Sequence, residues 1–302
     1  MTLRRMPVPR ELTAVSADGA RIHVEVYGPE GAPAVVLAHG WTCSIAFWAE
    51  QIRALATDHR VIAYDQRGHG RSPLPGPTGQ GYSTTSLADD LEAVLAATLG
   101  PGERAVLAGH SMGGMTIMAA AGRAGLRQHA AAVLLCSTGP SRLTAEATVL
   151  PLRPGGLRTL LTGAVLGSKA PLGPVTALSK KILKYATMGP GSAPDRVDTC
   201  ARIVHACPRP ARYGWSQVLA GLDLRAGLAD LRLPVAVVVG TADRLTPAAH
   251  SRAMAQALPH CTGLVELAGV GHMTPVEAPE AVTAQIRELT LTYLGAKEEA
   301  EA

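Results

Sequence analysis

Short, continuous apolar runs recur along the chain, separated by stretches long enough to form a helix. Runs of this kind occur at 34–38, 61–64, 105–108, 131–136, 235–239 and 264–267. Apolar residues at every position of such short runs are typical of parallel strands that are buried on both faces. The pattern therefore predicts a parallel sheet at the centre of the molecule.

Two earlier segments, 11–15 and 21–27, show a different pattern. Their apolar and polar residues alternate on either side of the turn dipeptide Asp18-Gly19. Alternation with a period of two around such a turn indicates an antiparallel hairpin. We expect this hairpin at an edge of the sheet.

Helical spacing separates most of the predicted strands. Residues 86–98 and 282–293 carry apolar or aromatic side chains at the three- and four-residue intervals of an amphipathic helix. The alternation of strand, helix and strand predicts an α/β fold, a doubly wound sheet with right-handed crossovers.

One long stretch interrupts this alternation. Between Thr138 and about Asp223 no strand pattern occurs, and Gly and Pro separate helical segments at 157–166, 175–185 and 197–206. We expect a helical insertion over the ends of the strands. The chain then divides into a first core part, a helical cap and a second core part, at 1–139, 140–222 and 223–302.

The predicted cap is rich in lysine. It contains Lys169, Lys180, Lys181 and Lys184. A solvated helix face accounts for such a charge run most simply. The alternative is a basic face that attracts acidic substrates or a membrane surface.

Composition narrows the class of protein. The 302 residues are 47% hydrophobic and 17% charged, with a net charge of +4 and five cysteines, none in a C-x-x-C pair. No basic stretch is interleaved with aromatic residues, so nucleic acid is not an expected partner. The apolar runs are much shorter than the roughly 20 residues that cross a bilayer, and residues 1–10 lack the apolar part of a secretory signal. We expect a cytoplasmic protein with free thiols and no stable membrane insertion.

Candidate chemistry begins at residues 109–113, Gly-His-Ser-Met-Gly, which match the pattern G-x-S-x-G. A predicted strand precedes this segment and a helix of small residues follows it, so we expect Ser111 on a sharp strand-to-helix turn. Flanking glycines let the strand and the helix approach each other closely. The start of a helix also presents N–H groups to negative charge. The pattern predicts Ser111 as a nucleophile.

A serine hydroxyl needs a base that takes its proton. His272 lies in a Gly-rich loop after the last predicted strand and fits this role best among the histidines. The base needs a carboxylate that fixes its tautomer. Asp243 follows the strand at 235–239, whereas the loop at 137–140 has no acidic residue. We expect a triad of Ser111, Asp243 and His272, and the alternative role for Asp243 is that of a helix N-cap.

Acyl transfer passes through a tetrahedral intermediate whose oxyanion needs N–H donors. The backbone of Met112, directly after the serine, is expected to supply one. Trp41, in the loop after the strand at 34–38, is expected to supply the second, and its side chain either lines the acyl pocket or packs in the core. The residues expected to contact the substrate are Trp41, His110 and Met273.

Taken together, these motifs resemble the α/β-hydrolase fold superfamily, in its esterase, lipase and perhydrolase branch with a helical cap. The matching segments are H-G-W at 39–41, D-Q-R-G-H-G-R-S at 65–72, G-H-S-M-G-G at 109–114 and G-V-G-H at 269–272. The resemblance implies a mostly parallel eight-stranded sheet flanked by helices, with the cap inserted after the sixth strand. It also implies that His39 and His110 support loops, and that Asp65, Arg67 and His69 build a turn rather than a metal site.

The resemblance implies a serine hydrolase that cleaves small-molecule carboxylic esters through an acyl-enzyme, without a metal ion or cofactor. Epoxide hydrolases and haloalkane dehalogenases carry Asp where Ser111 stands, which disfavours their chemistry. Many perhydrolases have H-G-x-P where this chain has Thr42. Perhydrolase or haloperoxidase-like activity, hydrolysis of thioesters, lactones or C–C bonds, and tailoring of a natural product are alternatives. A ligand binder on the same scaffold is the alternative from another class.

Overall fold

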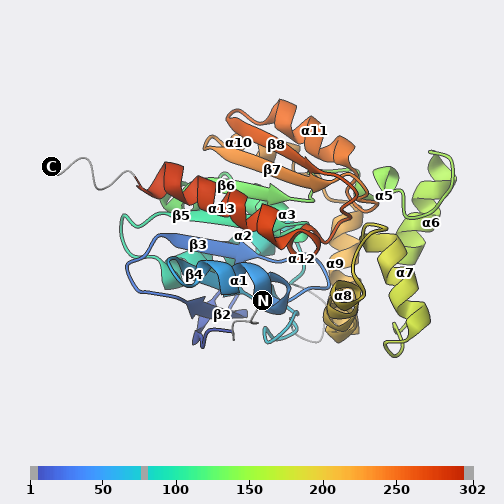
Figure 1. Cartoon of the computed structure of the whole chain (residues 1–302), viewed down its shortest axis with the longest axis horizontal. Coiled ribbons are helices and arrows are strands. Elements are labelled where there is room, and N and C mark those ends of the chain that lie inside the picture. Colours follow the sequence, from blue (N-terminus) through green and yellow to red (C-terminus); the bar gives the residue numbers. More distant parts are fainter. Residues whose placement is uncertain (1–5, 76–80, 296–302) are drawn as a thin grey trace.

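A single eight-stranded sheet organises the computed structural model of the chain, which describes residues 6–75 and 81–295. Its strand order is β1-β2-β4-β3-β5-β6-β7-β8 (Figure 1). The strands are β1 (Arg10–Val15), β2 (Arg21–Tyr27), β3 (Ala34–Ala38), β4 (Arg60–Tyr64), β5 (Ala105–His110), β6 (Ala130–Cys136), β7 (Val235–Gly240) and β8 (Cys261–Leu267). The predicted fold class is confirmed.

Strand pairing separates the hairpin from the rest of the sheet. β1 pairs with β2, and β2 with β4, in antiparallel fashion, whereas all later pairs are parallel. Every residue of β3, β5, β6 and β7 is buried, as the apolar runs predict. The same prediction is wrong for β8, which is partly exposed along its length. β8 is one of the two edge strands, and in the described part of the chain it pairs with β7 alone.

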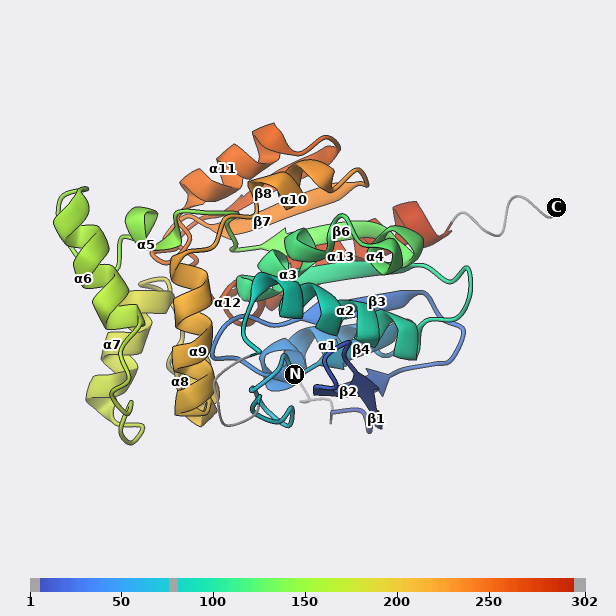
Figure 2. The ribbon, with the colours of Figure 1, turned by 180° about the vertical axis from the view of Figure 1, so that it is seen from behind.

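Helices cover both faces of the sheet. α2 (Thr84–Thr98) and α3 (Met112–Ala120) pack on one face, and α1 (Ala49–Leu55) and α13 (Pro279–Leu294) on the other (Figures 1 and 2). α2 and α13 confirm the two amphipathic patterns. Shorter helices complete the core: η1 (Ile45–Trp48), α4 (Ala124–His129), α10 (Arg225–Asp230), α11 (Ala248–Ala257) and α12 (Thr274–Glu277). Over the described ranges, no helix is both long and apolar enough to cross a membrane.

Between β6 and the short helix α10, the described chain forms five helices and no strand of the sheet. They are α5 (Leu143–Glu146), α6 (Gly156–Leu166), α7 (Ala177–Thr187), α8 (Pro194–Ala206) and α9 (Arg209–Ala220). The sequence pattern predicts α6, α7 and α8 but misses α9, whose first turn contains Pro210. Proline at this position is compatible with a helix, because the N–H groups of the first turn have no intrahelical acceptor.

The two ends of this helical segment meet at the sheet. Leu224 donates its N–H to the carbonyl of Pro140 at 2.7 Å, and Ser141 forms an isolated antiparallel bridge with Asp223. The chain therefore leaves and rejoins the core at one place. Figures 1 and 2 show α6 to α9 as a group beside the sheet rather than on its faces.

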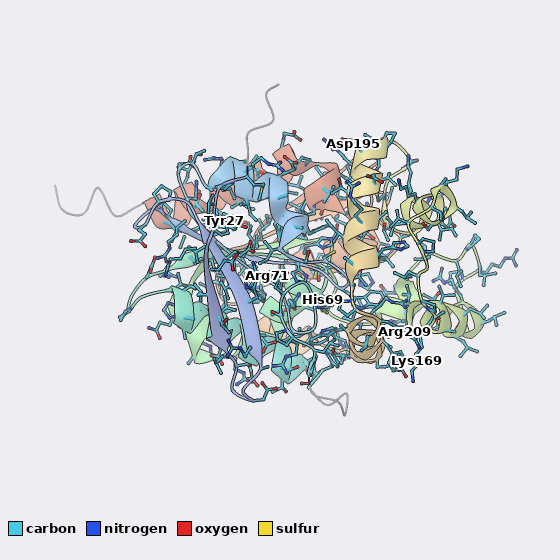
Figure 3. All side chains as sticks on the ribbon, turned by 90° about the horizontal axis from the view of Figure 1, so that it is seen from below. Tyr27, His69, Arg71, Lys169, Asp195 and Arg209 are labelled. Atoms are coloured by element: carbon cyan, nitrogen blue, oxygen red, sulfur yellow. The ribbon has the colours of Figure 1, made fainter. Side chains whose placement is uncertain are left out.

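A buried loop after β4 connects distant parts of the chain. The guanidinium of Arg67 donates to Asp90 on α2 and to Asp18 in the hairpin turn, at 2.7 Å in each case. Trp215 on α9 donates its indole N–H to the carbonyl of Arg67 at 3.1 Å. The carboxylate of Asp65 accepts two backbone N–H groups. These contacts agree with the expected turn-building role, and Figure 3 shows His69 and Arg71 of this loop between Tyr27 on β2 and Arg209 on α9.

Candidate active site

Ser111 lies on a strained turn between β5 and α3. Its φ of 51° and ψ of −116° belong to a conformation that residues with a side chain rarely adopt. Close packing holds this turn: a Cβ on Gly113 would lie 2.0 Å from the carbonyl oxygen of Ala38, and one on Gly109 would lie 2.6 Å from the backbone of Gly113. The two glycines are therefore required by the approach of α3 to β3 and β5.

His272 and Asp243 meet at the carboxyl ends of β7 and β8. The Nδ1 of His272 donates to Oδ2 of Asp243 at 2.8 Å, and the two residues are 3% and 4% exposed. With its proton on Nδ1, the imidazole presents an unprotonated Nε2. α11 begins at Ala248 after Pro247, so Asp243 is not its N-cap. Instead, Oδ1 of Asp243 accepts the N–H groups of the loop that leads to this helix.

Thr246 is part of this arrangement and is missed by the sequence analysis. Its hydroxyl donates to Oδ2 of Asp243 at 2.9 Å and lies 3.2 Å from Nδ1 of His272. The only signal in the sequence is local, because an Asp side chain in a loop often accepts hydrogen bonds from groups two or three residues later. Thr246 thus holds the carboxylate in the orientation that the imidazole needs.

His110 supports the histidine loop. Its Nε2 donates to the carbonyl oxygen of His272 at 2.8 Å, and the two ring centroids are 4.9 Å apart. Ser111 lines the same cavity as His272, although no hydrogen bond joins the two side chains in the described structure. Catalytic hydrogen bonds of this kind often form only when a substrate is bound.

The structure gives the surroundings of the two backbone N–H groups that are predicted to bind an oxyanion. Met112 is the first residue of α3, where an N–H has no intrahelical acceptor. Trp41 follows Gly40, on which a Cβ would lie 3.2 Å from the Cβ of Ser111, so this loop packs against the serine. The side chain of Trp41 lines the cavity and donates its indole N–H to the carbonyl of Arg212 on α9 at 3.0 Å. The Trp41 side chain therefore forms part of the cavity wall and links this loop to α9 by a hydrogen bond.

Thr42 adopts a conformation that proline cannot adopt. Its φ is 61°, whereas the proline ring fixes φ near −65°. Its N–H also donates to Nε2 of His69 at 3.2 Å, and proline has no such donor. The backbone conformation of this loop is therefore incompatible with the proline of the H-G-x-P pattern at position 42.

A cavity of about 430 Å³ lies above Ser111 and His272. Its walls are mostly apolar, and helices α6 to α9 supply a large part of them. Trp41, His110 and Met273, the residues expected to contact the substrate, all line it. Among the residues that the structure describes, no group of three His, Cys, Asp or Glu side chains could hold a metal ion.

Comparison with known proteins identifies the family. A family model described as the alpha/beta hydrolase family matches residues 35–285. The chain belongs to this family. Two solved structures are similar to it. The esterase RhEst1 from Rhodococcus sp. ECU1013 is 25% identical, with a TM-score of 0.77, and the match covers 94% of this chain and 99% of the esterase. The enol-lactonase from Burkholderia xenovorans LB400 is 25% identical, with a TM-score of 0.72, and the match covers 92% of this chain and 99% of the enol-lactonase.

Sequence relatives match over different lengths. A 3-oxoadipate enol-lactonase of Acinetobacter baylyi is 25% identical over 91% of this chain and 95% of its own length. A protein of Variovorax paradoxus, provisionally named carbamate hydrolase RutD, is 46% identical over 31% of this chain. The chain aligns with only 34% of the length of that relative.

Three buried histidines around the site are held neutral. Burial lowers the pKa of His39 to about 4 and that of His69 to about 3, and it lowers the pKa of His110 well below its usual value. The Nε2 atoms of His39 and His69 accept backbone N–H groups. Protonation of either ring would therefore replace a hydrogen bond with a repulsive contact.

These shifts predict that acid destabilises the fold. In the unfolded chain a histidine ionises near pH 6.5, so below this pH the unfolded chain binds protons that the folded chain does not. Above about pH 7 the three histidines contribute their full amount to the free energy of unfolding. This contribution declines as the pH falls toward their lowered pKa values. We expect the free energy of unfolding, measured by urea denaturation, to fall by about 1 kcal/mol for each buried histidine between pH 6.5 and 5.5.

Two variants test the origin of this effect. In a folded His69→Asn chain the loss between pH 6.5 and 5.5 should be smaller by about 1 kcal/mol, whereas His260→Asn, at an exposed position, should keep the full loss. A free energy of unfolding that does not change between pH 6.5 and 5.5 would contradict the conclusion that the three buried histidines are neutral in the folded chain.

Proposed function

We propose that the protein is a serine hydrolase that cleaves small, largely apolar carboxylic esters through an acyl-enzyme. The observation that supports this most directly is the hydrogen bond between His272 and a buried Asp243, beside a serine on a strained turn at the base of an apolar cavity. Buried residues that are arranged in this way can generate an alkoxide nucleophile at neutral pH.

In the proposed mechanism, Ser111 Oγ attacks the ester carbonyl while its proton passes to Nε2 of His272. The oxyanion is held by the N–H groups of Trp41 and Met112. Collapse of this intermediate breaks the C–O bond, and the leaving alkoxide takes the proton from His272. Water then attacks the acyl-enzyme, with His272 as base, and releases the acid and free Ser111. Asp243 keeps His272 oriented and stabilises its charged form.

We also propose that residues 140–222 act as a cap that selects the substrate. The helices of this segment line much of the cavity. The cavity volume of about 430 Å³ lies near the lower end of the range of roughly 300 to 1,000 Å³ that is usual for ligand pockets. Esters with short or medium acyl chains should therefore fit better than long-chain esters.

Two further observations favour hydrolysis of an ester or a lactone over perhydrolysis. The solved structures that are similar to this chain include an esterase and an enol-lactonase, which both act on C–O acyl bonds. Thr42, with its positive φ, stands where many perhydrolases have proline. This loop therefore lacks a feature that many perhydrolases share, which disfavours perhydrolysis.

Replacement of the nucleophile tests the proposal. We expect Ser111→Ala to lower kcat/KM on p-nitrophenyl esters by at least about a thousandfold, because no other group supplies the attacking oxygen. The wild type should show its optimum between acetyl and octanoyl in a series that extends to palmitoyl. Initial rates across this series measure both effects.

Ser251→Ala is the matched control, because Ser251 is buried on α11 and does not line the cavity. Its activity should remain within about twofold of wild type. Wild-type rates in a folded Ser111→Ala protein would contradict the assignment of the nucleophile.

A second candidate is hydrolysis of a lactone or ester that carries a carboxylate. Arg212 on α9 lines the cavity and is 7% exposed. Its guanidinium donates to the carbonyl of Ala170, and in the described part of the chain no carboxylate forms an ion pair with it. A buried cation without a counter-ion is costly, and a substrate carboxylate would compensate it.

Arg212→Met separates this candidate from the first. We expect the variant to raise KM at least tenfold for a p-nitrophenyl ester of a dicarboxylic acid, because a hydrogen-bonded charge pair is lost, and to change the rate on p-nitrophenyl butyrate less than about twofold. Arg209→Met, at an exposed position of α9, should leave both rates unchanged. Equal effects of Arg212→Met on both esters would contradict the carboxylate site.

A further inference from the structure

The helix α6 exposes its apolar side. It buries Arg158 and Thr162, whereas Leu157, Leu160 and Val165 are 66%, 69% and 54% exposed. The exposed positions, together with Leu161, follow helical spacing along one side. A helix that packs against a protein core has the opposite arrangement, so nothing within residues 6–75 and 81–295 covers the apolar side of α6.

The next helix, α7, has the same character. None of its residues is buried. Leu178, Ile182 and Tyr185 recur every three or four residues along one side and are 68%, 59% and 45% exposed. Lys181 lies exposed among them. An exposed apolar surface of this extent is unusual for a protein that has no partner there.

Two of these exposed side chains also line the cavity. Val165 of α6 and Ile182 of α7 line the cavity, and each is more than half exposed. Figures 1 and 2 show α6 and α7 as the outermost helices of the molecule, beyond α8 and α9. A partner that covered this surface would therefore lie next to the cavity that Ser111 lines.

Charge indicates the kind of occupant. From residue 148 to residue 194 the sequence contains no Asp or Glu, and its basic residues are Arg153, Arg158, Lys169, Lys180, Lys181 and Lys184. Lys180 pairs with Asp198 on α8 and Arg158 is buried. Arg153, Lys169 and Lys181 are exposed. The ammonium of Lys169 lies 4.3 Å from the ring centre of Tyr213 on α9, and Figure 3 shows Lys169 beside Arg209 of that helix. The surface is therefore both apolar and basic.

We propose that residues 152–187, which contain α6, α7 and the segment between them, dock on an anionic lipid surface. Apolar side chains enter the boundary between head groups and acyl chains, and the lysine and arginine side chains contact lipid phosphates. A second copy of the chain fits this surface less well, because two identical basic surfaces repel each other. The proposal concerns binding alone and does not depend on the reaction proposed above.

Sedimentation with lipid vesicles tests the proposal. The full chain is mixed with vesicles of phosphatidylcholine, with and without phosphatidylglycerol, at low and high salt. We expect at least tenfold stronger binding to the vesicles that contain phosphatidylglycerol. High salt should weaken this binding, because it screens the charges at the surface.

Variants outside the cavity lining identify the surface. The double variant Leu160→Ser with Leu178→Ser should weaken binding about tenfold or more, because both side chains lose their burial in lipid. Lys181→Glu should weaken it about fivefold or more. The matched controls are Leu291→Ser, at a 75% exposed leucine of α13, and Arg127→Glu, at an exposed arginine of α4. Both should bind as the wild type does.

Hydrolysis of a soluble p-nitrophenyl ester and the thermal midpoint are measured on each variant and should not change. The proposal is overturned if the wild type does not bind anionic vesicles, or if the α6 and α7 variants bind as tightly as the wild type. It is also overturned if light scattering shows a dimer that the Leu160→Ser, Leu178→Ser variant loses, since the surface then joins two copies. Vesicle binding without ester hydrolysis would support the docking surface and contradict only the proposed reaction.

Discussion

The close approach of α3 to β3 and β5 is the constraint on which the candidate active site depends. Gly113 lies so near the carbonyl of Ala38 that no side chain fits there, and the chain reverses direction at Ser111 with a positive φ. This geometry lifts the serine out of the sheet and places the first N–H of α3 beside it. Strain of this kind persists only where the surrounding packing enforces it.

The loops around Ser111 are fixed by buried hydrogen bonds that also reach the helical segment. Trp41 bonds to the backbone of α9, and Trp215 on α9 bonds to the backbone of Arg67. Arg67 in turn is paired with Asp90 on α2. A shift of α9 would therefore move the loop that carries one of the proposed oxyanion donors. The same hydrogen bonds of Trp41 and Trp215 would therefore connect the helices proposed to select the substrate with the loop proposed to stabilise the oxyanion.

Local patterns were sufficient to predict the sheet and the residues at its carboxyl edge. Short apolar runs marked the strands, and parallel strands place the residues that follow them at one edge, which is why Ser111, Asp243 and His272 could be grouped from the sequence. The comparisons confirm the fold class and the family. The roles of these three residues stay a proposal that the geometry supports.

Features that depend on tertiary contacts could not be predicted in this way. The exposure of β8 follows from its place at the end of the sheet, and the contact of Thr246 with Asp243 requires a particular loop conformation. The helical segment between β6 and β7 shows most clearly what local patterns predict and what they leave open. Its periodicity gives the positions of α6 and α7 but not which side of each helix faces the solvent, and the apolar side is the one exposed.

Covalent trapping of the nucleophile tests the central claim most directly. The protein is treated with diethyl p-nitrophenyl phosphate, which transfers a diethylphosphoryl group to an activated serine with release of p-nitrophenolate, and its peptides are examined by mass spectrometry. The account predicts one adduct, on Ser111, that forms in step with the loss of esterase activity and is absent from Ser111→Ala. An adduct on another residue, or full ester hydrolysis by a protein that forms none, would contradict it.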